Sequence, residues 1–225
     1  MKKAIAFVPV RCGSKSIKLK NIKLFCGRPL VWWVLAALEE SRTVGKIYVA
    51  TDCDEIANVV TNMQFSRVAI YRRSLENSQD TSSTEDAIFE FLANNPLPED
   101  VPFYLVQATS PFTTSEQLDD AFDLFIESKA DSLLTCTRIK KFLWSEDGIP
   151  LNYDYRFRPR RQDFSGVLVE NGAFYITTVG AVLRAKNRLS GKIAVFEMDD
   201  ERTSYELDEE IDWIICEALM RERQK

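Results

Sequence analysis

Basic and small polar residues gather in one short loop near the start of the sequence. The loop follows an apolar run that predicts a buried strand. Its polar members are Arg11, Ser14, Lys15, Lys20 and Asn21. Arginine offers a planar fork to phosphate oxygens, lysine acts as a point charge, and backbone N–H groups in a glycine-containing turn can form an anion-binding nest. We therefore expect the loop to bind a polyanion, in particular a nucleoside triphosphate, although a solvated basic loop is the alternative.

A second set of polar residues could contact the same nucleotide. Arg73 follows a short apolar run, and Ser82 and Thr84 stand at the start of a predicted helix. A helix start rich in serine and threonine presents hydroxyls and free N–H groups to bound polar groups. The alternative is a plain capping box, in which Ser82 pairs with Glu85. Both functions are compatible with the pattern.

Two acidic residues near the end of the sequence have the spacing of a metal site. Glu206 and Asp208 are two positions apart, so in an extended segment their carboxylates share one face. Two hard oxygen ligands suit Mg²⁺ that is also held by substrate phosphates. The structural alternative is that Asp208 caps the following helix and that Glu206 is a surface acid.

Further polar residues are candidates for contact with a second substrate. Gln107 and Ser110 follow a predicted buried strand, at the carboxyl edge where open α/β sheets bind ligands. Arg161 and Asn171 flank the return of a segment without periodicity and could reach a substrate that carries a carboxylate. For the segment 109–111 the alternative is an ordinary turn.

The composition limits the possible classes of protein. A chain of 225 residues with 45% apolar content can bury one full core. A net charge of −5 argues against general attraction to nucleic acid, so any anion binding must be local. The five cysteines lack C-x-x-C spacing, which indicates reduced thiols in the cytoplasm and no zinc site. The sequence contains no histidine, which excludes catalysis by imidazole.

Strand-like apolar runs alternate with helix-like periodic ones, which predicts one α/β domain over residues 1–225. The sheet should be mostly parallel, with helices on both of its faces. We expect strands at 4–10, 46–51, 68–71, 103–107, 131–136, 173–176 and 193–196. The segment 138–166 shows no period and predicts a protruding arm that contains a hairpin. No apolar stretch is long enough to span a bilayer, and no signal-peptide pattern is present.

Three helices have clear signals. Pro29 can open a helix over 30–40, and Thr114 with Gln117 forms a capping box before another helix. The last helix has an apolar face that we expect to be buried. Its members are Ile211, Ile214, Ile215, Ala218 and Leu219.

The order of these motifs resembles that of the N-acylneuraminate cytidylyltransferases, the CMP-sialic acid synthetases. The resemblance runs through nearly the whole chain, and each motif alone would be weak. The matching segments are 11–21, 51–52, 73–80, 107–111, 160–163, 170–172 and 204–208. The resemblance implies a Rossmann-like fold of the nucleotide-diphospho-sugar transferase type. It also implies a homodimer in which the arm 138–166 is exchanged between the subunits.

The resemblance assigns roles to individual residues. The positions that match nucleotide contacts are Arg11, Ser14, Lys15, Lys20, Asn21, Arg73, Ser82 and Thr84. The positions assigned to the sugar substrate are Gln107, Ser110, Arg161 and Asn171. The expected catalytic residues are Arg11, Lys20 and Asp208.

The metal site and the acyl pocket depart from the family pattern. Asp208 matches a metal-binding aspartate, so the expected cofactor is Mg²⁺, with Mn²⁺ as an alternative. Glu206 stands where the family usually has aspartate, and its longer side chain moves the ligand oxygen outward. Trp144 occupies a position that is a sugar-contacting lysine in some bacterial members, so the pocket for the acyl group cannot be copied across.

The implied activity joins CTP to a 2-keto-3-deoxy sugar acid, such as N-acetylneuraminate or KDN, with release of pyrophosphate. The same reaction on KDO, legionaminic acid or pseudaminic acid stays open. A CTP-binding regulatory protein without turnover is an alternative of another class. A dinucleotide-dependent oxidoreductase is disfavoured, because the first turn carries cations in place of the glycine fingerprint. We expect a cytoplasmic protein without nucleic-acid or membrane partners.

Overall fold

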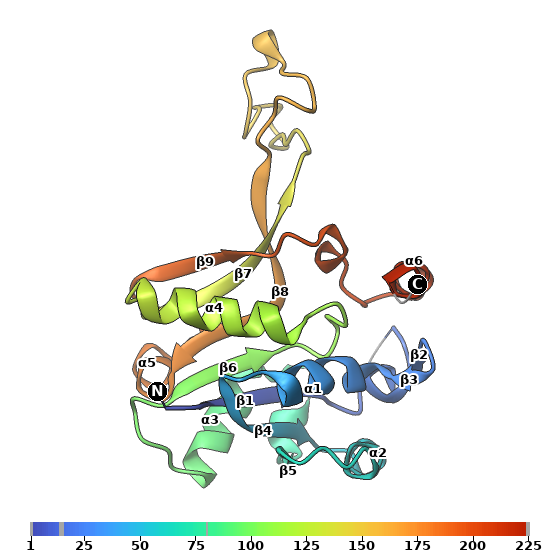
Figure 1. The fold of residues 1–225 in the computed structure, drawn as a ribbon, viewed down its shortest axis with the longest axis vertical. Coiled ribbons are helices and arrows are strands. Elements are labelled where there is room, and N and C mark those ends of the chain that lie inside the picture. The colour runs from blue at the N-terminus through green and yellow to red at the C-terminus, as the bar shows by residue number, and fades with distance from the viewer. Residues whose placement is uncertain (1, 14–15, 80, 224–225) are drawn as a thin grey trace.

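A mostly parallel sheet with strand order β5-β4-β1-β6-β8-β7-β9 forms the centre of the molecule (Figure 1). The computed structural model describes residues 2–13, 16–79 and 81–223. Strand β8 runs antiparallel to β6 and β7, whereas the other neighbouring pairs are parallel. The strands are β1 (Ala4–Pro9), β4 (Val44–Thr51), β5 (Val68–Arg72), β6 (Pro102–Val106), β7 (Ser132–Ile139), β8 (Val167–Thr178) and β9 (Ile193–Glu197).

Helices cover both faces of the sheet, as the sequence predicted. Apolar side chains of α1, α2 and α4 pack on one face, and those of α3 and α5 pack on the other. Alternation along β1 explains the division, because Ala6 and Val8 point to the first face and Phe7 to the second. The helices are α1 (Leu30–Glu40), α2 (Asp54–Asn62), α3 (Thr84–Asn94), α4 (Ser115–Glu127), α5 (Val179–Ala185) and α6 (Glu210–Arg223).

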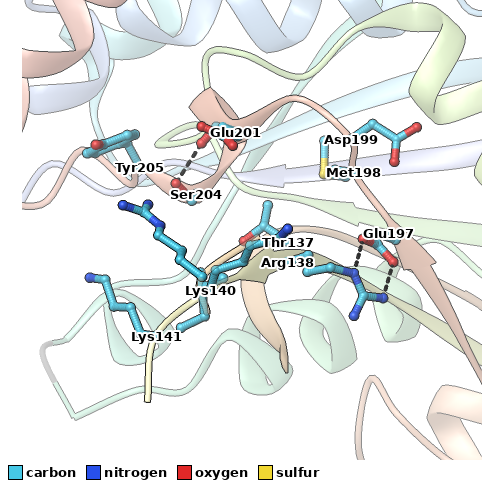
Figure 2. A pocket seen from close by; sticks show the side chains of 12 residues that line it. Thr137, Arg138, Lys140, Lys141, Glu197, Met198, Asp199, Glu201, Ser204 and Tyr205 are labelled. Atoms are coloured by element: carbon cyan, nitrogen blue, oxygen red, sulfur yellow. Dashed lines mark hydrogen bonds and ion pairs between the residues drawn. The ribbon is translucent and has the colours of Figure 1, made fainter. Parts of the chain in front are cut away.

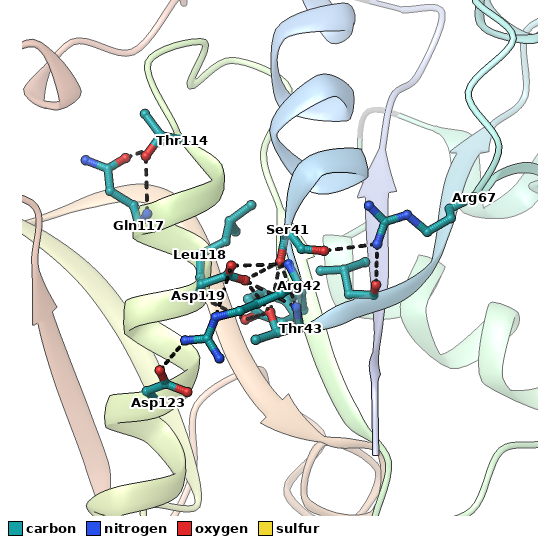
Figure 3. Close-up of polar contacts among 11 residues, drawn as sticks. Ser41, Arg42, Thr43, Arg67, Thr114, Gln117, Leu118, Asp119 and Asp123 are labelled. Carbon is teal, nitrogen blue, oxygen red and sulfur yellow. Dashed lines mark hydrogen bonds and ion pairs between the residues drawn. The ribbon is translucent and has the colours of Figure 1, made fainter. Parts of the chain in front are cut away.

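The loop between α1 and β4 is joined to α4 by a polar network (Figure 3). The Asp119 carboxylate accepts hydrogen bonds from the Ser41 hydroxyl at 2.6 Å and from the Thr43 hydroxyl at 3.0 Å. These bonds lower the pKa of Asp119 although burial opposes the shift. Thr43 also lies 3.2 Å from the hydroxyl of Tyr104, which is buried in β6. The network therefore fixes α4 beside the strands that carry the candidate site.

Two capping boxes were predicted, and one of them is wrong. Thr114 and Gln117 form the expected reciprocal bonds at the start of α4 (Figure 3). At the start of α3 the box is formed by Ser83 and Asp86, not by Ser82 and Glu85. The helix begins one residue later than the pattern suggested, so the Ser82 hydroxyl donates to a backbone carbonyl of the preceding turn.

A third apolar cluster lies outside the two main layers and includes α6. It contains Ile17, Phe25, Leu207 and Trp213, and it joins the first loop, the short hairpin β2–β3 (Leu24–Phe25 and Arg28–Pro29) and the C-terminal segment. The rings of Phe25 and Trp213 meet edge to face, with centroids 5.6 Å apart. This cluster brings two distant parts of the chain to the same end of the sheet.

The buried face of α6 differs from the predicted one. The helix buries Trp213, Cys216 and Met220, whereas Ile211 and Ile214 are 58% and 66% exposed. The large indole removes more apolar surface from water than either isoleucine, which explains the choice of face. The expectation that Ile211, Ile214 and Ala218 are buried is therefore wrong, whereas Ile215 and Leu219 are partly buried.

The segment between β7 and β8 projects far from the sheet, as predicted (Figure 1). The arm begins two residues later than expected, because Arg138 and Ile139 still pair with β8. Inside the arm, an antiparallel bridge between Trp144 and Pro150 closes a small hairpin.

Candidate active site

The carboxyl ends of four parallel strands place polar residues at one edge of the sheet. Arg11 follows β1, Asp52 follows β4, Arg73 follows β5 and Gln107 follows β6. Backbone hydrogen bonds hold these positions, such as that from the Arg73 N–H to the Thr51 carbonyl at 3.1 Å. Open α/β sheets bind ligands at this edge.

A cleft opens at this edge. Its larger part, of about 390 Å³, is lined by Pro9, Arg11, Ser16, Lys20, Asn21, Gln107, Ala108, Thr109, Asp208 and Glu209. A smaller part, of about 240 Å³, is lined by Pro9, Arg11, Arg73, Ser82, Ser83, Thr84 and Gln107. Because Pro9, Arg11 and Gln107 line both parts, the two cavities are adjacent. Most of the predicted nucleotide contacts thus lie around these neighbouring cavities, whereas Ser14 and Lys15 lie outside the described residues.

Lys20 connects the basic loop to the C-terminal segment. Its ammonium donates to the Leu207 carbonyl at 2.7 Å and to a carboxylate oxygen of Asp208 at 3.0 Å. The Lys20 side chain is only 12% exposed, whereas that of Asp208 is 65% exposed. The Ser16 hydroxyl adds a bond to the backbone carbonyl of Asp208. The structure therefore brings together two predicted catalytic residues, Lys20 and Asp208, that lie far apart in the sequence.

The basic loop is also held from its other side. The Asn21 amide donates to the Arg11 carbonyl at 3.5 Å, and the Cys12 N–H donates to an Asp52 carboxylate oxygen at 3.0 Å. The Arg11 guanidinium reaches the Gln79 carbonyl at 3.5 Å. Asn21 is nearly buried, so its amide stabilises the loop as well as lining the cleft.

Arg73 has an incompletely satisfied guanidinium in the smaller part of the cleft. One of its terminal nitrogens donates to the Asn77 carbonyl, whereas its buried Nε has no hydrogen-bond partner among the described residues. Burial lowers the pKa of Arg73, although Asp52 and Glu90 favour its charged form. A buried donor without a partner is costly, so a ligand acceptor at this point would be stabilised.

Glu206 and Asp208 repel each other electrostatically. Loss of hydration raises the pKa of Glu206, and the charges of Asp208 and Glu170 raise it further while Lys20 opposes them. The Asp208 carboxylate accepts a hydrogen bond from Lys20, and the Asp212 carboxylate accepts the N–H groups of Asp208 and Glu209 at the start of α6. The capping alternative for Asp208 stays a prediction. No group of three or more His, Cys, Asp or Glu among the described residues is arranged to hold a metal ion.

The predicted sugar-side residues are not all brought together within one chain. Gln107 lines the cleft, but Arg161 lines a separate cavity of about 320 Å³ at the base of the arm. Figure 2 shows this second cavity, with Lys140 and Lys141 on one side and Tyr205 on the other.

The two remaining sugar-side predictions have other surroundings. Ser110 is nearly buried and lines neither part of the cleft. The amide of Asn171 is also buried and donates to the Thr203 carbonyl at 3.0 Å, so the structure gives it a packing function. Their roles as substrate contacts stay predictions.

Three site residues were missed in the sequence, and their signals differ. Thr109 lies two residues after Gln107, so the strand-end rule that selected Gln107 could have included it. The Ser16 hydroxyl donates a hydrogen bond to the backbone carbonyl of Asp208, which lies far away in the sequence. No local sequence pattern predicts such a bond. Glu209 also lines the cleft. Its only signal in the sequence was its position directly after Asp208, a predicted metal ligand.

The molecule is an α/β protein with a cleft at the carboxyl edge of its sheet, where a basic loop after the first strand meets Asp208 of the C-terminal segment. Residues 5–156 match the family model described as "Cytidylyltransferase". The chain belongs to the cytidylyltransferase family. The resemblance inferred from the motifs is thereby confirmed.

The similar curated proteins agree with this family. The chain is 39% identical over 219 residues to the N-acylneuraminate cytidylyltransferase of Oncorhynchus mykiss, covering 94% of this chain and 49% of that protein. It is 36% identical over 220 residues to N-acylneuraminate cytidylyltransferase A of Danio rerio, with the same coverage of 94% and 49%. The chain thus spans about half the length of these relatives.

A shorter relative is matched along nearly its whole length. CMP-N,N'-diacetyllegionaminic acid synthase of Legionella pneumophila is 26% identical over 231 residues, covering 98% of this chain and 97% of that protein. The structure of a CMP-2-keto-3-deoxy-manno-octonic acid synthetase complexed with CTP has a TM-score of 0.73 at 17% identity, covering 98% and 99% of the two chains. The latter likeness confirms the fold. No helix in the described part of the chain is long and apolar enough to cross a membrane.

The raised pKa of Glu206 predicts a pH-dependent effect of its neutralisation. A carboxyl group whose pKa is higher in the folded state destabilises that state increasingly as pH rises above the unfolded pKa of about 4.3. We therefore expect Glu206→Gln to raise the free energy of unfolding at pH 7, and to have little effect at pH 4. The gain should be about 0.5 kcal/mol, because solvent screens a partly exposed charge.

Urea denaturation between pH 4 and pH 8 measures this effect. Glu209→Gln is the matched control, since Glu209 is an exposed neighbour in the same segment. We expect the control to show no gain that grows with pH. A Glu206→Gln protein that is less stable than the parent at pH 7 would contradict the inferred repulsion.

Proposed function

We propose that the chain is a CTP-dependent cytidylyltransferase that activates a nonulosonic acid and releases pyrophosphate. One observation supports this function most strongly: the Lys20 ammonium lies between the basic loop and Asp208 inside the cleft. A cation and a carboxylate held side by side can receive a triphosphate and its counter-ion together. The 36–39% identity to proteins named N-acylneuraminate cytidylyltransferase supports the same activity.

The two parts of the cleft suit different parts of the nucleotide. Arg11 and Lys20 line the larger cavity and supply positive charge for the phosphates. Arg73, Ser82 and Thr84 line the smaller one, where donors such as the Arg73 Nε suit the cytosine ring and its ribose. Because Arg11 lines both cavities, it would stand at the junction of the nucleoside and its phosphates.

Glu206 and Asp208 fit a divalent cation. Burial raises the pKa of Glu206 and the charge of Asp208 raises it further, and a divalent cation held by these carboxylates would offset both effects. Hard oxygen ligands suit Mg²⁺, with Mn²⁺ as an alternative, and substrate phosphates would complete the ligand set. Bound there, the ion would neutralise charge on the phosphates and on the leaving pyrophosphate.

The reaction requires positioning more than covalent chemistry. The hydroxyl at C2 of the sugar acid attacks the α-phosphorus of CTP in line, the bond from that phosphorus to the bridging oxygen breaks, and pyrophosphate leaves. Arg11 and Lys20 hold the phosphate oxygens and stabilise the charge that develops on them. The hydroxyl proton passes to a carboxylate or a phosphate oxygen, since the chain has no histidine.

Loss of either partner in the Lys20–Asp208 pair should abolish most turnover. We expect Lys20→Ala and Asp208→Asn each to lower kcat by about 10²-fold or more, because Lys20 would act on the phosphates directly and Asp208 would hold the cation that neutralises them. Lys18→Ala is the matched control, since Lys18 is an exposed lysine of the same loop that does not line the cleft. Pyrophosphate release measures the activity, and circular dichroism checks the fold. Parental rates in both folded variants would overturn the assignment.

The identity of the sugar is tested with a panel. Pyrophosphate release with CTP and Mg²⁺ should occur with N-acetylneuraminate or KDN and be much weaker with KDO, legionaminic and pseudaminic acid. The alternatives have support too, since the chain is 26% identical to a CMP-N,N'-diacetyllegionaminic acid synthase over nearly all of both chains. Release with one of the other acids would reassign the substrate. CTP binding without release for any acid would favour a regulatory protein.

We also propose that the chain forms a homodimer in which the arm completes the partner's site. Large apolar side chains on the arm are exposed, and Phe157 is 80% and Leu151 62% exposed. Such surface favours a protein contact. Arg161 does not share a cavity with Gln107 in one chain, so a sugar contact from Arg161 would act on the cleft of a second copy.

Subunit complementation tests the exchange of the arm. We expect Lys20→Ala and Arg161→Ala each to be nearly inactive alone. When the two proteins are unfolded, mixed in equal amounts and refolded, mixed dimers contain one intact site, so turnover should recover to about one quarter of the parent. Mixtures of either variant with itself are the controls. No recovery in a mixture that light scattering shows to be dimeric would contradict a contribution from the second copy.

A further inference from the structure

Two cysteine thiols meet beside the cleft. The sulfur atoms of Cys12 and Cys53 are 2.8 Å apart, and both thiols are free. A disulfide bond is about 2.05 Å long, so a small approach would join them. Cys12 is exposed in the basic loop, whereas Cys53 is only 7% exposed and stands directly before α2. One thiol is therefore open to reagents in solution and the other is protected behind it.

The fold builds this contact from the ends of two paired strands. β1 and β4 are in register up to Pro9 and Ala50, so the residues that follow them stay close together. The Cys53 N–H donates to the Thr51 hydroxyl at 3.1 Å, which fixes the backbone on that side. On the other side, the bond from the Cys12 N–H to Asp52 holds the loop against the end of β4.

We propose that Cys12 and Cys53 form a reversible disulfide that weakens binding of the nucleotide in the adjacent cleft. The disulfide itself depends only on the geometry of the two thiols. Its effect on the nucleotide rests on the proposed function, because it concerns CTP. Disulfides of this kind in reducing compartments are usually transient and redox-sensing.

The oxidant would be a hydroperoxide. The Cys12 thiolate attacks the outer oxygen of the peroxide, the O–O bond breaks, and Cys12 becomes a sulfenic acid while the peroxide is reduced to an alcohol or water. The Cys53 sulfur then attacks the sulfenic sulfur, the S–O bond breaks, and the oxygen leaves as water with the thiol proton. Two thiols have then lost two electrons to one peroxide. A dithiol reductant reverses the reaction by thiol–disulfide exchange.

The disulfide acts on the cleft through Arg11. This arginine precedes Cys12 in the chain and lines both parts of the cleft. Forming the disulfide shortens the distance between the sulfur atoms from 2.8 Å to about 2.05 Å, which shifts the backbone beside Arg11 toward Cys53. The guanidinium is then displaced from its position in the reduced chain, and a misplaced phosphate contact weakens binding.

The first step is slow at neutral pH. Contact with Cys53, together with loss of hydration, raises the pKa of Cys12 to about 11. Only a small fraction of Cys12 is therefore thiolate at neutral pH, so the oxidation requires excess peroxide.

Peptide mapping and binding measurements test the proposal. The fully reduced chain is incubated with excess hydrogen peroxide, digested without reductant and analysed by mass spectrometry for a peptide that links Cys12 to Cys53. CTP affinity is measured by calorimetry before oxidation, after it and after reduction with excess dithiothreitol. We expect the linked peptide, a dissociation constant for CTP that rises about fivefold or more on oxidation, and its recovery on reduction.

Two variants make the outcome specific. Cys53→Ser removes the linkage and should bind CTP equally before and after oxidation. Cys26→Ser is the matched control and should behave as the parent, since Cys26 lies in the β2–β3 hairpin outside the cleft. Absence of the linked peptide overturns the modification site. A linked peptide with unchanged CTP affinity overturns the regulation alone, and a reduced chain that binds no CTP contradicts the proposed function while leaving the disulfide in place.

Discussion

The candidate site depends on the position of one ammonium group. Lys20 reaches across to the Leu207 carbonyl and the Asp208 carboxylate, and so joins the first loop to a segment almost the length of the chain away. A nearly buried ammonium is stable only when its hydrogen-bond donors are satisfied, so the loop and the segment constrain each other. Without this contact the cations of the loop and the carboxylates of the C-terminal segment would have no common position.

An apolar cluster supports that polar contact. Ile17 and Leu207 are both buried in it, three residues before Lys20 and one residue before Asp208. The aromatic contact of Phe25 with Trp213 anchors α6 behind the same segment. Burial of these side chains supplies free energy that offsets the partial burial of Glu206 beside Asp208, and both the burial and the neighbouring charge raise the pKa of Glu206.

Much of the fold could be predicted because it follows from local periodicity. The alternation of strands and helices, the helix signals around Pro29 and Thr114, and the arm without periodicity all correspond to observed elements. The errors occur where tertiary packing decides. The face of α6 was set by Trp213 rather than by the regular spacing of isoleucines, and the box at α3 shifted because two serines competed for one cap. The face of α6 depends on packing against residues far away in the sequence, whereas the cap of α3 is a local choice between two adjacent serines that the pattern left undecided.

The site was predictable to the extent that strand ends determine it. Arg11, Arg73 and Gln107 each follow a parallel strand, so one rule places all three at the same edge. This rule does not place residues that lie on segments outside the sheet. Arg161 lies on the arm, and its distance from Gln107 in one chain is the consequence of a segment that leaves the sheet altogether. No strand-end rule places the side chains of such a segment, because their positions depend on contacts outside the sheet.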